Sequence, residues 1–111
     1  MTKKEIEMML DEIGIEYRYH HFEEKEAIQP PFICWLMPET DHFAADGIAY
    51  VKITELDIEL YTDEKNIQLE EQVEKVLENN GIFFQKKEIY IESEEMYETL
   101  YEMEVEFRYE E

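Results

Sequence analysis

The sequence has 111 residues, which is enough for one domain around one hydrophobic core, so residues 1–111 are predicted to form a single domain. Its formal charge of −20, from 30 acidic and 10 basic residues, argues against direct binding to nucleic acid or to an anionic membrane. Binding to a phosphate backbone requires Lys and Arg. The 14% aromatic content is not typical of a disordered chain. We therefore expect a folded domain whose partners are other proteins, above all ones with basic patches, or divalent cations.

The single cysteine, Cys34, excludes an internal disulfide and fits a reducing compartment. The N-terminal residues read as an amphipathic helix that contains acids, which is not the pattern of a signal peptide. No apolar run approaches the roughly 20 residues that a membrane span needs. We expect the protein to fold in the cytoplasm.

The first half of the chain predicts one helix followed by strands. Thr2 and Glu5 have the spacing of a capping box, and Gly14 is typical of a helix end, so a helix is predicted over residues 2–13. Residues 15–22 alternate as in a strand. After an acidic connection that ends in two prolines, the continuous apolar run 32–37 predicts a strand that is covered on both faces.

Residues 38–47 are turn formers and acids around an isolated Phe43, and they predict the longest loop, a candidate for a protruding hairpin tip. Extended structure resumes at residue 48. The apolar positions change from odd numbers (Val51, Ile53) to even numbers (Leu56 onward), which predicts a β-bulge near residues 54–55, because a one-residue slip moves side chains to the other face.

The second half predicts a second helix and two more strands. Residues 62–66 begin the helix, with Asp63 or Asn66 as its cap, and the pair Asn80–Gly81 ends it. Its apolar stripe is narrow, and Glu70 is expected on the outer face with the other acids. Strands follow at 82–91 and at about 96–109. The predicted order α-β-β-β-α-β-β indicates an α+β fold, with a mainly antiparallel (mixed) sheet of about five strands and two helices packed on one face.

The residues that could carry chemistry do not form a recognisable site. Cys34 could act as a nucleophile beside a histidine, but it lies inside an apolar run, which predicts a buried, inert thiol. His20 and His21, as neighbours on a strand, would point to opposite faces and could not share a metal, and Asp41 with His42 has no zinc-site spacing. The three glycines form no phosphate-binding pattern. We expect no catalytic, metal or cofactor site and no enzymatic activity.

Two acidic stripes are the most informative pattern. Glu55, Asp57 and Glu59 alternate with apolar residues, as do the glutamates at 102, 104 and 106. If these strands pair, their carboxylates share one face of the sheet. That face is either an ordinary solvated surface or a docking surface for a basic partner. The candidate contact residues on the stripes and around the loop are Trp35, Met37, Asp41, His42, Phe43, Asp46, Glu102, Glu104 and Glu106.

The order of segments also resembles a known family. The strand DIELY (57–61), the acidic turn TDEKN, the helix LEEQVEKVLENNGIFF and the closing segment EIYIESEEMYETLYEMEVEF resemble small phage-encoded tail-completion or tail-terminator proteins of prophages in Gram-positive bacteria. The upstream segment YRYHHFEEKEAIQPPFICW is similar to the strand, acidic turn and Pro-led strand of that family. The resemblance covers nearly the whole chain, and its motifs are compositional.

The resemblance implies a structural role in a tailed phage or prophage particle. Such proteins form rings, typically of six subunits, at the head-proximal end of the tail, where they end tube polymerisation and join the tail to the head. The implied partners are further copies of the chain, the tail tube protein and the head connector protein. The implied location is the host cytoplasm during assembly and then the virion tail. Three alternatives stay open: a head-completion or neck protein of the same particle, an acidic DNA-mimic inhibitor of a DNA-binding protein, and a small hydrolase that uses Cys34.

Overall fold

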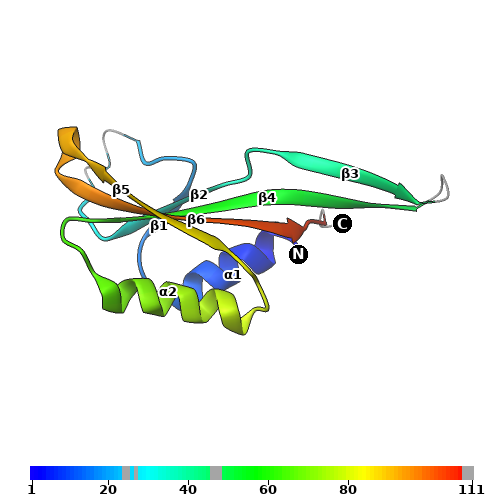
Figure 1. Cartoon of the computed structure of the whole chain (residues 1–111), viewed down its shortest axis with the longest axis horizontal. Coiled ribbons are helices and arrows are strands. Elements are labelled where there is room, and N and C mark those ends of the chain that lie inside the picture. Colours follow the sequence, from blue (N-terminus) through cyan, green and yellow to red (C-terminus); the bar gives the residue numbers. More distant parts are fainter. Residues whose placement is uncertain (24–25, 27, 46–48, 109–111) are drawn as a thin grey trace.

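The computed structural model describes residues 1–23, 26, 28–45 and 49–108, with the backbone alone for residues 41–45 and 49–51. Within these ranges the chain forms two α-helices, six strands and one 3-10 turn (Figure 1). In chain order the elements are α1 (Lys3–Ile13), β1 (Tyr17–Tyr19), β2 (Phe32–Leu36), β3 (Thr40–Ala45), β4 (Ala49–Thr62), α2 (Ile67–Asn79), β5 (Gln85–Ile91), η2 (Glu92–Glu94) and β6 (Met96–Glu106).

Local signals in the sequence determine where α1 begins and ends and where α2 begins. The Thr2 hydroxyl accepts a hydrogen bond from the Glu5 backbone N–H, and the Glu5 carboxylate accepts one from the Thr2 N–H, which completes the predicted capping box. Gly14 ends α1 with φ of +86°, a conformation that costs glycine little. Asn66 caps α2 by accepting a hydrogen bond from Leu69 N–H. Both predicted helices are confirmed.

The strands form one mixed sheet in the order β1-β2-β4-β6-β5, and β3 pairs with the outer half of β4. Only β1 and β2 run parallel among the described strands, and all other pairs are antiparallel. The long pairing of β4 with β6 runs from Ile53↔Glu106 to Thr62↔Tyr97 without interruption. The α+β class is confirmed, and the sheet has one strand more than the sequence suggested.

Both helices cover the same face of the sheet, as predicted, and the core lies between them and the sheet (Figure 1). The even-numbered residues of β4 and the odd-numbered residues of β6 point into this core, and the largest side chains there are Trp35 and Tyr101. The described core residues are Ile6, Met9, Leu10, Ile13, Ile33, Trp35, Leu56, Ile58, Leu60, Leu69, Val73, Val76, Leu77, Tyr101, Met103 and Val105.

The region predicted as a long loop at 38–47 is largely a strand. Residues Thr40–Ala45 form β3 and pair with Ala49–Thr54 of β4. The resulting hairpin extends past the helices as a narrow arm, and the whole molecule measures 51 × 29 × 23 Å (Figure 1). Hydrogen bonding to β4 overrides the weak strand preference of this polar, alanine-containing stretch, which is why its composition misled the prediction.

The predicted bulge near residues 54–55 is wrong. The register of β4 against β6 is continuous through Thr54↔Val105 and Glu55↔Glu104. What changes at this point is the strand that pairs with the other edge of β4: β3 pairs with residues 49–54 and β2 with residues 57–61. The even-numbered side chains of β4 belong to the core between the helices and the sheet from Leu56 onward. The apolar pattern changes because the surroundings of the strand change, without any inserted residue.

Two strands are shorter than predicted. The strand expected at 15–22 is only Tyr17–Tyr19, because His20 takes a left-handed conformation (φ of +70°) that ends it. The strand expected at 82–91 begins at Gln85. Neither described helix is long and apolar enough to cross a membrane.

Candidate assembly surfaces

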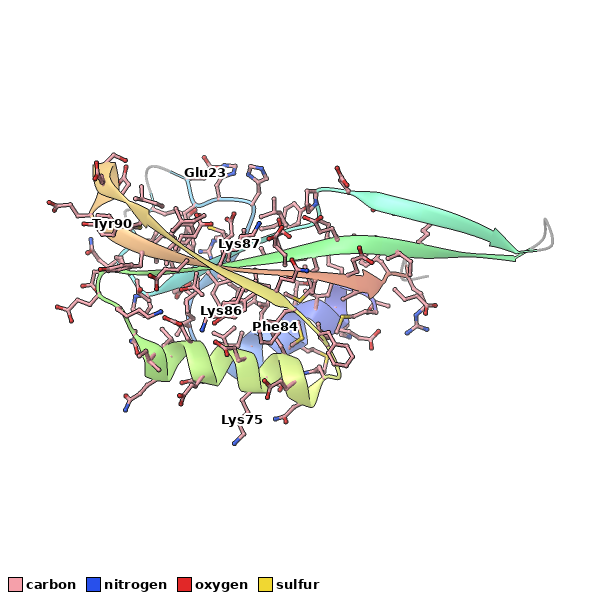
Figure 2. The ribbon with its side chains drawn as sticks, viewed as in Figure 1. Glu23, Lys75, Phe84, Lys86, Lys87 and Tyr90 are labelled. Carbon is pink, nitrogen blue, oxygen red and sulfur yellow. The ribbon has the colours of Figure 1, made fainter. Side chains whose placement is uncertain are left out.

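The predicted carboxylate face exists on the side of the sheet that the helices leave open. Glu55 lies opposite Glu104 and Asp57 lies opposite Glu102 across the β4–β6 pair, so the two acidic stripes meet as expected. Lys87 on β5 points to this face, and its Nζ lies 3.0 Å from Glu102 Oε1 (Figure 2). Like charges placed directly opposite each other destabilise a sheet. This face therefore holds a local excess of negative charge.

Asp57 is a strongly perturbed carboxylate on that face. Partial burial, a hydrogen bond with Glu55 and repulsion by neighbouring carboxylates raise the pKa of Asp57 to about 7. Its Oδ1 atom is enclosed and has no hydrogen-bond partner among the described residues. Glu55, Asp57 and Glu102 each bring one oxygen within 4.8 Å of the others, which is compatible with a hard cation. All three are half-exposed, however, and such acidic clusters are common without any ion.

A groove of about 760 Å³ lies at the base of the arm, on the helix side of the sheet. Its apolar lining comes from Tyr19, Met37 and Phe107, which are half-buried or exposed. Its cationic lining is unusual for so acidic a chain, because it holds four of the ten Lys and Arg residues. These four are Lys3, Lys4, Lys52 and Arg108. We call this groove, with its three apolar and four cationic residues, the basic groove.

Phe83 is the most exposed large apolar side chain among the described residues, with 95% of its surface open to solvent. It lies in the connection between α2 and β5. Glu102 and Glu104 line a hollow on one side of it, and Glu104 and Glu106 line a hollow on the other. We call Phe83 with these three glutamates the acidic knob. The sequence reasoning missed it, although an aromatic pair directly after a Gly-ended helix was a usable signal.

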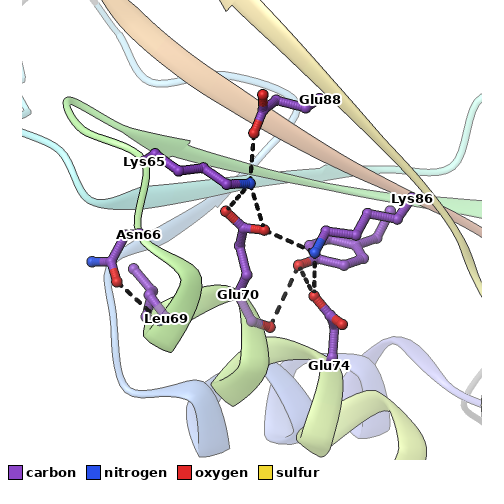
Figure 3. A network of polar contacts seen from close by, with 8 residues as sticks. Lys65, Asn66, Leu69, Glu70, Glu74, Lys86 and Glu88 are labelled. Carbon is purple, nitrogen blue, oxygen red and sulfur yellow. Dashed lines mark hydrogen bonds and ion pairs between the residues drawn. The ribbon is translucent and has the colours of Figure 1, made fainter.

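A buried ion-pair network joins α2 to β5 on the helix side of the sheet (Figure 3). Glu70 was expected on the outer face of α2, but it is only 3% exposed. Lys65 and Lys86 each place Nζ 2.8 Å from one of its carboxylate oxygens. Burial alone would raise the pKa of Glu70, but hydrogen bonds from the two lysines outweigh it and hold that pKa below its usual range. Helix α2 turns Glu70 toward the sheet because β5 supplies Lys86 there.

The same network holds the hydroxyl of a core tyrosine. Tyr101 donates a hydrogen bond to Glu74 Oε2 at 2.8 Å, and Lys86 Nζ lies 2.8 Å from the same oxygen. Lys86 lies on the side of β5 that faces α2, whereas Lys87 lies on the other side (Figure 2). All these polar groups are satisfied within the fold, so the network is a structural feature and not a binding site.

Cys34 is buried, as predicted, with 5% of its surface exposed. Burial, followed by the charges of Glu59 and Glu98, raises the pKa of the thiol to about 11. A thiol with so high a pKa carries almost no thiolate at neutral pH. Its location and its pKa both oppose the reading of Cys34 as a nucleophile.

The histidine prediction needs a correction. His20 and His21 were expected on opposite faces of a strand, but the strand ends at Tyr19, and the left-handed backbone at His20 brings the two rings together. Their Nδ1 atoms lie 3.1 Å apart at the surface. No third ligand from the described residues completes a metal site there.

The candidate contact residues separate into three groups. Trp35 is wrong as a contact residue, because it is 1% exposed and lies in the core, where one edge of its ring packs against the half-exposed Tyr19. Met37 is half-buried and lines the basic groove, while Glu102, Glu104 and Glu106 lie on the open face and form part of the acidic knob. Asp41, His42 and Phe43 lie in β3, where only the backbone is described, and Asp46 lies outside the described residues.

Comparisons with known proteins identify the fold and no family. No protein-family model matches the chain, and no curated protein matches it in sequence. Among solved structures, the chain is similar to a protein chain in the virion of a native gene transfer agent particle. The match has a TM-score of 0.55 and 12% identity, and it covers 88% of this chain and 82% of that chain. At this identity the likeness shows that the two chains share a fold.

Proposed function

We propose that this chain is a structural protein of a tailed-phage or phage-like particle. The observation that carries the proposal is the fold match to a virion chain, which extends over 88% of the sequence. The resemblance of the segments at 57–61 and beyond to tail-completion proteins supports it independently, because it rests on sequence order and not on coordinates. Assembly, and not catalysis, is the activity of the domain, and it uses no cofactor.

Within such a particle, the chain forms a ring at the head-proximal end of the tail, which ends tube polymerisation and joins tail to head. The arm formed by β3 and β4 supports this role, because a hairpin that extends past the core can reach a neighbouring subunit or the tube. The outer strand β5 also supports it, because six of its seven residues are exposed and its free edge can accept a further strand. An acidic ring wall would let DNA pass without holding it.

Deleting the gene from the prophage tests the proposal. Loss of a tail terminator is expected to give tails of uncontrolled length beside separate, DNA-filled heads in electron micrographs. Leaking heads with tails of normal length would assign the chain to the neck instead. Normal tails joined to normal heads would contradict both roles.

A shortened arm tests the part that the hairpin plays. Replacing residues 43–51 by an Asn-Gly turn keeps the His42–Lys52 pair. It also leaves the buried part of β4, which begins at Thr54, unchanged. We expect the variant to fold with an unchanged melting curve and to fail to restore infectivity to the deletion strain. Full rescue by the shortened arm would show that the arm makes no essential contact.

A further inference from the structure

We propose that the acidic knob of one copy of this chain inserts into the basic groove of the next copy, with Phe83 as the anchor. This contact rests on the proposed function, since it is the subunit contact of the ring. The two surfaces are complementary in both chemistry and charge. An aromatic side chain flanked by glutamates would meet an apolar floor flanked by lysines and arginine.

Exposure makes Phe83 the natural anchor. A phenylalanine that is 95% exposed gains the full benefit of burial only when another surface covers it. Aromatic residues at the centre of an interface commonly carry much of the binding energy. The basic groove offers Met37, Phe107 and Tyr19 as apolar partners, and its volume of about 760 Å³ exceeds what one benzyl group needs.

Charge selects a second copy as the occupant. At a net charge of −20, two copies repel each other on average, so they can associate only where opposite charges meet. Among the described residues that line the hollows around Phe83, the charged side chains are all carboxylates, and the cation beside them is the α-amino group of Met1, which donates a hydrogen bond to the Glu106 carbonyl. The basic groove is lined by four cations and by the carboxylate of Glu7, and one of the four, Arg108, also pairs with Glu5 at 3.4 Å.

The positions of the two surfaces fit a ring. Phe83 precedes β5, which is one outer strand of the sheet, whereas most of the groove lining comes from α1, β1, β3 and β4. Phe107 and Arg108, which follow β6, bring the groove close to Glu106 of the knob. One patch therefore meets a different patch on the neighbour. Contacts of this head-to-tail kind close into rings when the rotation between subunits divides a full turn. A symmetric dimer would instead need one patch to meet itself.

Disulfide capture tests the contact with purified protein. One copy carries Gln85→Cys beside the knob, and the other carries Thr40→Cys at the groove rim, both in a Cys34→Ala background. Both positions are exposed. Mild oxidation of the mixture should give the mixed Gln85→Cys/Thr40→Cys dimer, whereas a copy with Ser93→Cys, exposed at the other end of β5, should stay at background. Adding Phe83→Ala should lower the yield of the mixed dimer, since losing an anchor weakens binding on the order of 30-fold.

Charge reversal gives a second, independent readout. The groove variant Lys3→Glu/Arg108→Glu and the knob variant Glu104→Lys/Glu106→Lys change exposed residues only. Each variant alone, carrying single cysteines as above, should lose the cross-link. An equimolar mixture of the two variants should regain the cross-link. The reversed groove of one variant then meets the reversed knob of the other, and the native knob of the first meets the native groove of the second. A mixed dimer no more abundant than the Ser93→Cys control, or a mixture that regains nothing, overturns the contact.

The two proposals fail separately. Uncontrolled tails in the deletion strain without the mixed dimer would keep the particle role and overturn the knob-and-groove contact. A mixed dimer from a chain whose deletion leaves particles normal would support the contact and remove the particle role.

Discussion

The two faces of the sheet shift the pKa values of their enclosed carboxyl groups in opposite directions. On the helix side, Glu70 is almost fully enclosed, yet Lys65 and Lys86 keep it ionised, with a pKa below the usual range. On the open side, the side chain of Asp57 is more accessible to solvent, yet its partial burial, followed by the nearby Glu55 and Glu102, raises its pKa to about 7. From solvent exposure alone, the more enclosed Glu70 would be expected to have the higher pKa.

Burial raises the pKa of both carboxyl groups, and the difference teaches that the charges beside them decide whether this rise is reversed, as at Glu70, or increased, as at Asp57. A buried charge is tolerated when cations and hydrogen bonds replace its water. A half-exposed charge becomes costly when its neighbours carry the same sign. On the helix side, the charges are therefore compensated within the fold. On the open side, carboxylates repel one another, and a basic partner surface would reduce that repulsion.

Removing the cations beside Glu70 should have the largest effect. The double variant Lys65→Ala/Lys86→Ala leaves the buried side chain of Glu70 without a counter-charge. We expect the free energy of unfolding at pH 7 to fall by about 3 kcal/mol, as for a broken buried ion pair. Urea unfolding measures this value.

Lys75→Ala is the matched control, because Lys75 lies on α2 and points away from the sheet (Figure 2). It should change the free energy of unfolding by less than about 0.5 kcal/mol. A double variant as stable as this control would mean that the network contributes nothing to the fold.

Neutralising Asp57 should have a smaller effect of the opposite sign. Asp57→Asn removes one of the crowded charges, and we expect the free energy of unfolding at pH 8 to rise by about 1 kcal/mol. Glu12→Gln, which removes an exposed carboxylate of α1, should leave it nearly unchanged. Equal effects of the two changes would show that general net charge, and not local crowding, limits stability.

The pH dependence gives Asp57 a distinct signature. Its pKa is about 7 in the folded chain against an ordinary value of 3.8, so between these values the folded state holds a proton that the unfolded state has lost. From this group, stability should rise as the pH falls from 7 toward 4, and Asp57→Asn should abolish that rise in urea titrations at stepped pH. Glu70 acts in the opposite direction, because its lowered pKa means that stability is lost when acid finally protonates it.

The thiol on the open side of β2 should react slowly. Cys34 pairs across the strands with Glu59, and its 5% exposure predicts labelling by a thiol reagent far slower in the native protein than in urea. Cys34→Ala should cost on the order of 1 kcal/mol through lost packing. Labelling at the denatured rate would contradict the enclosed position.

The smallest expected effect is on DNA. The uncancelled carboxylates of the open face should prevent binding to double-stranded DNA tighter than about 10⁻⁶ M at physiological salt, which fluorescence anisotropy can measure. The variant Glu104→Lys/Glu106→Lys should gain little, since its net charge, −16 after four units of change, remains strongly negative. Saturable binding by the native chain would reveal a cationic surface stronger than the basic groove.

The sequence by itself determined the elements whose signals are local. The capping box at Thr2, the Gly14 end and the Asn66 cap predict both helices, because hydrogen bonds within a few residues form them. The alternation in residues 55–60 and 97–107 predicted both the shared carboxylate face and the packed face, because side chains on a strand alternate strictly.

Only the tertiary structure decided the features that depend on distant neighbours. Residues 40–45 become a strand because β4 supplies the hydrogen bonds, and the apolar pattern of β4 changes where β3 replaces β2 beside it. Glu70 points toward the sheet because Lys86 on β5 provides a counter-charge there. Trp35 is buried in the core. The basic groove joins residues from both ends of the chain, Lys3 and Arg108, with Met37 and Lys52 from the middle. No local pattern in a sequence records such long-range proximity, since folding alone brings these residues together.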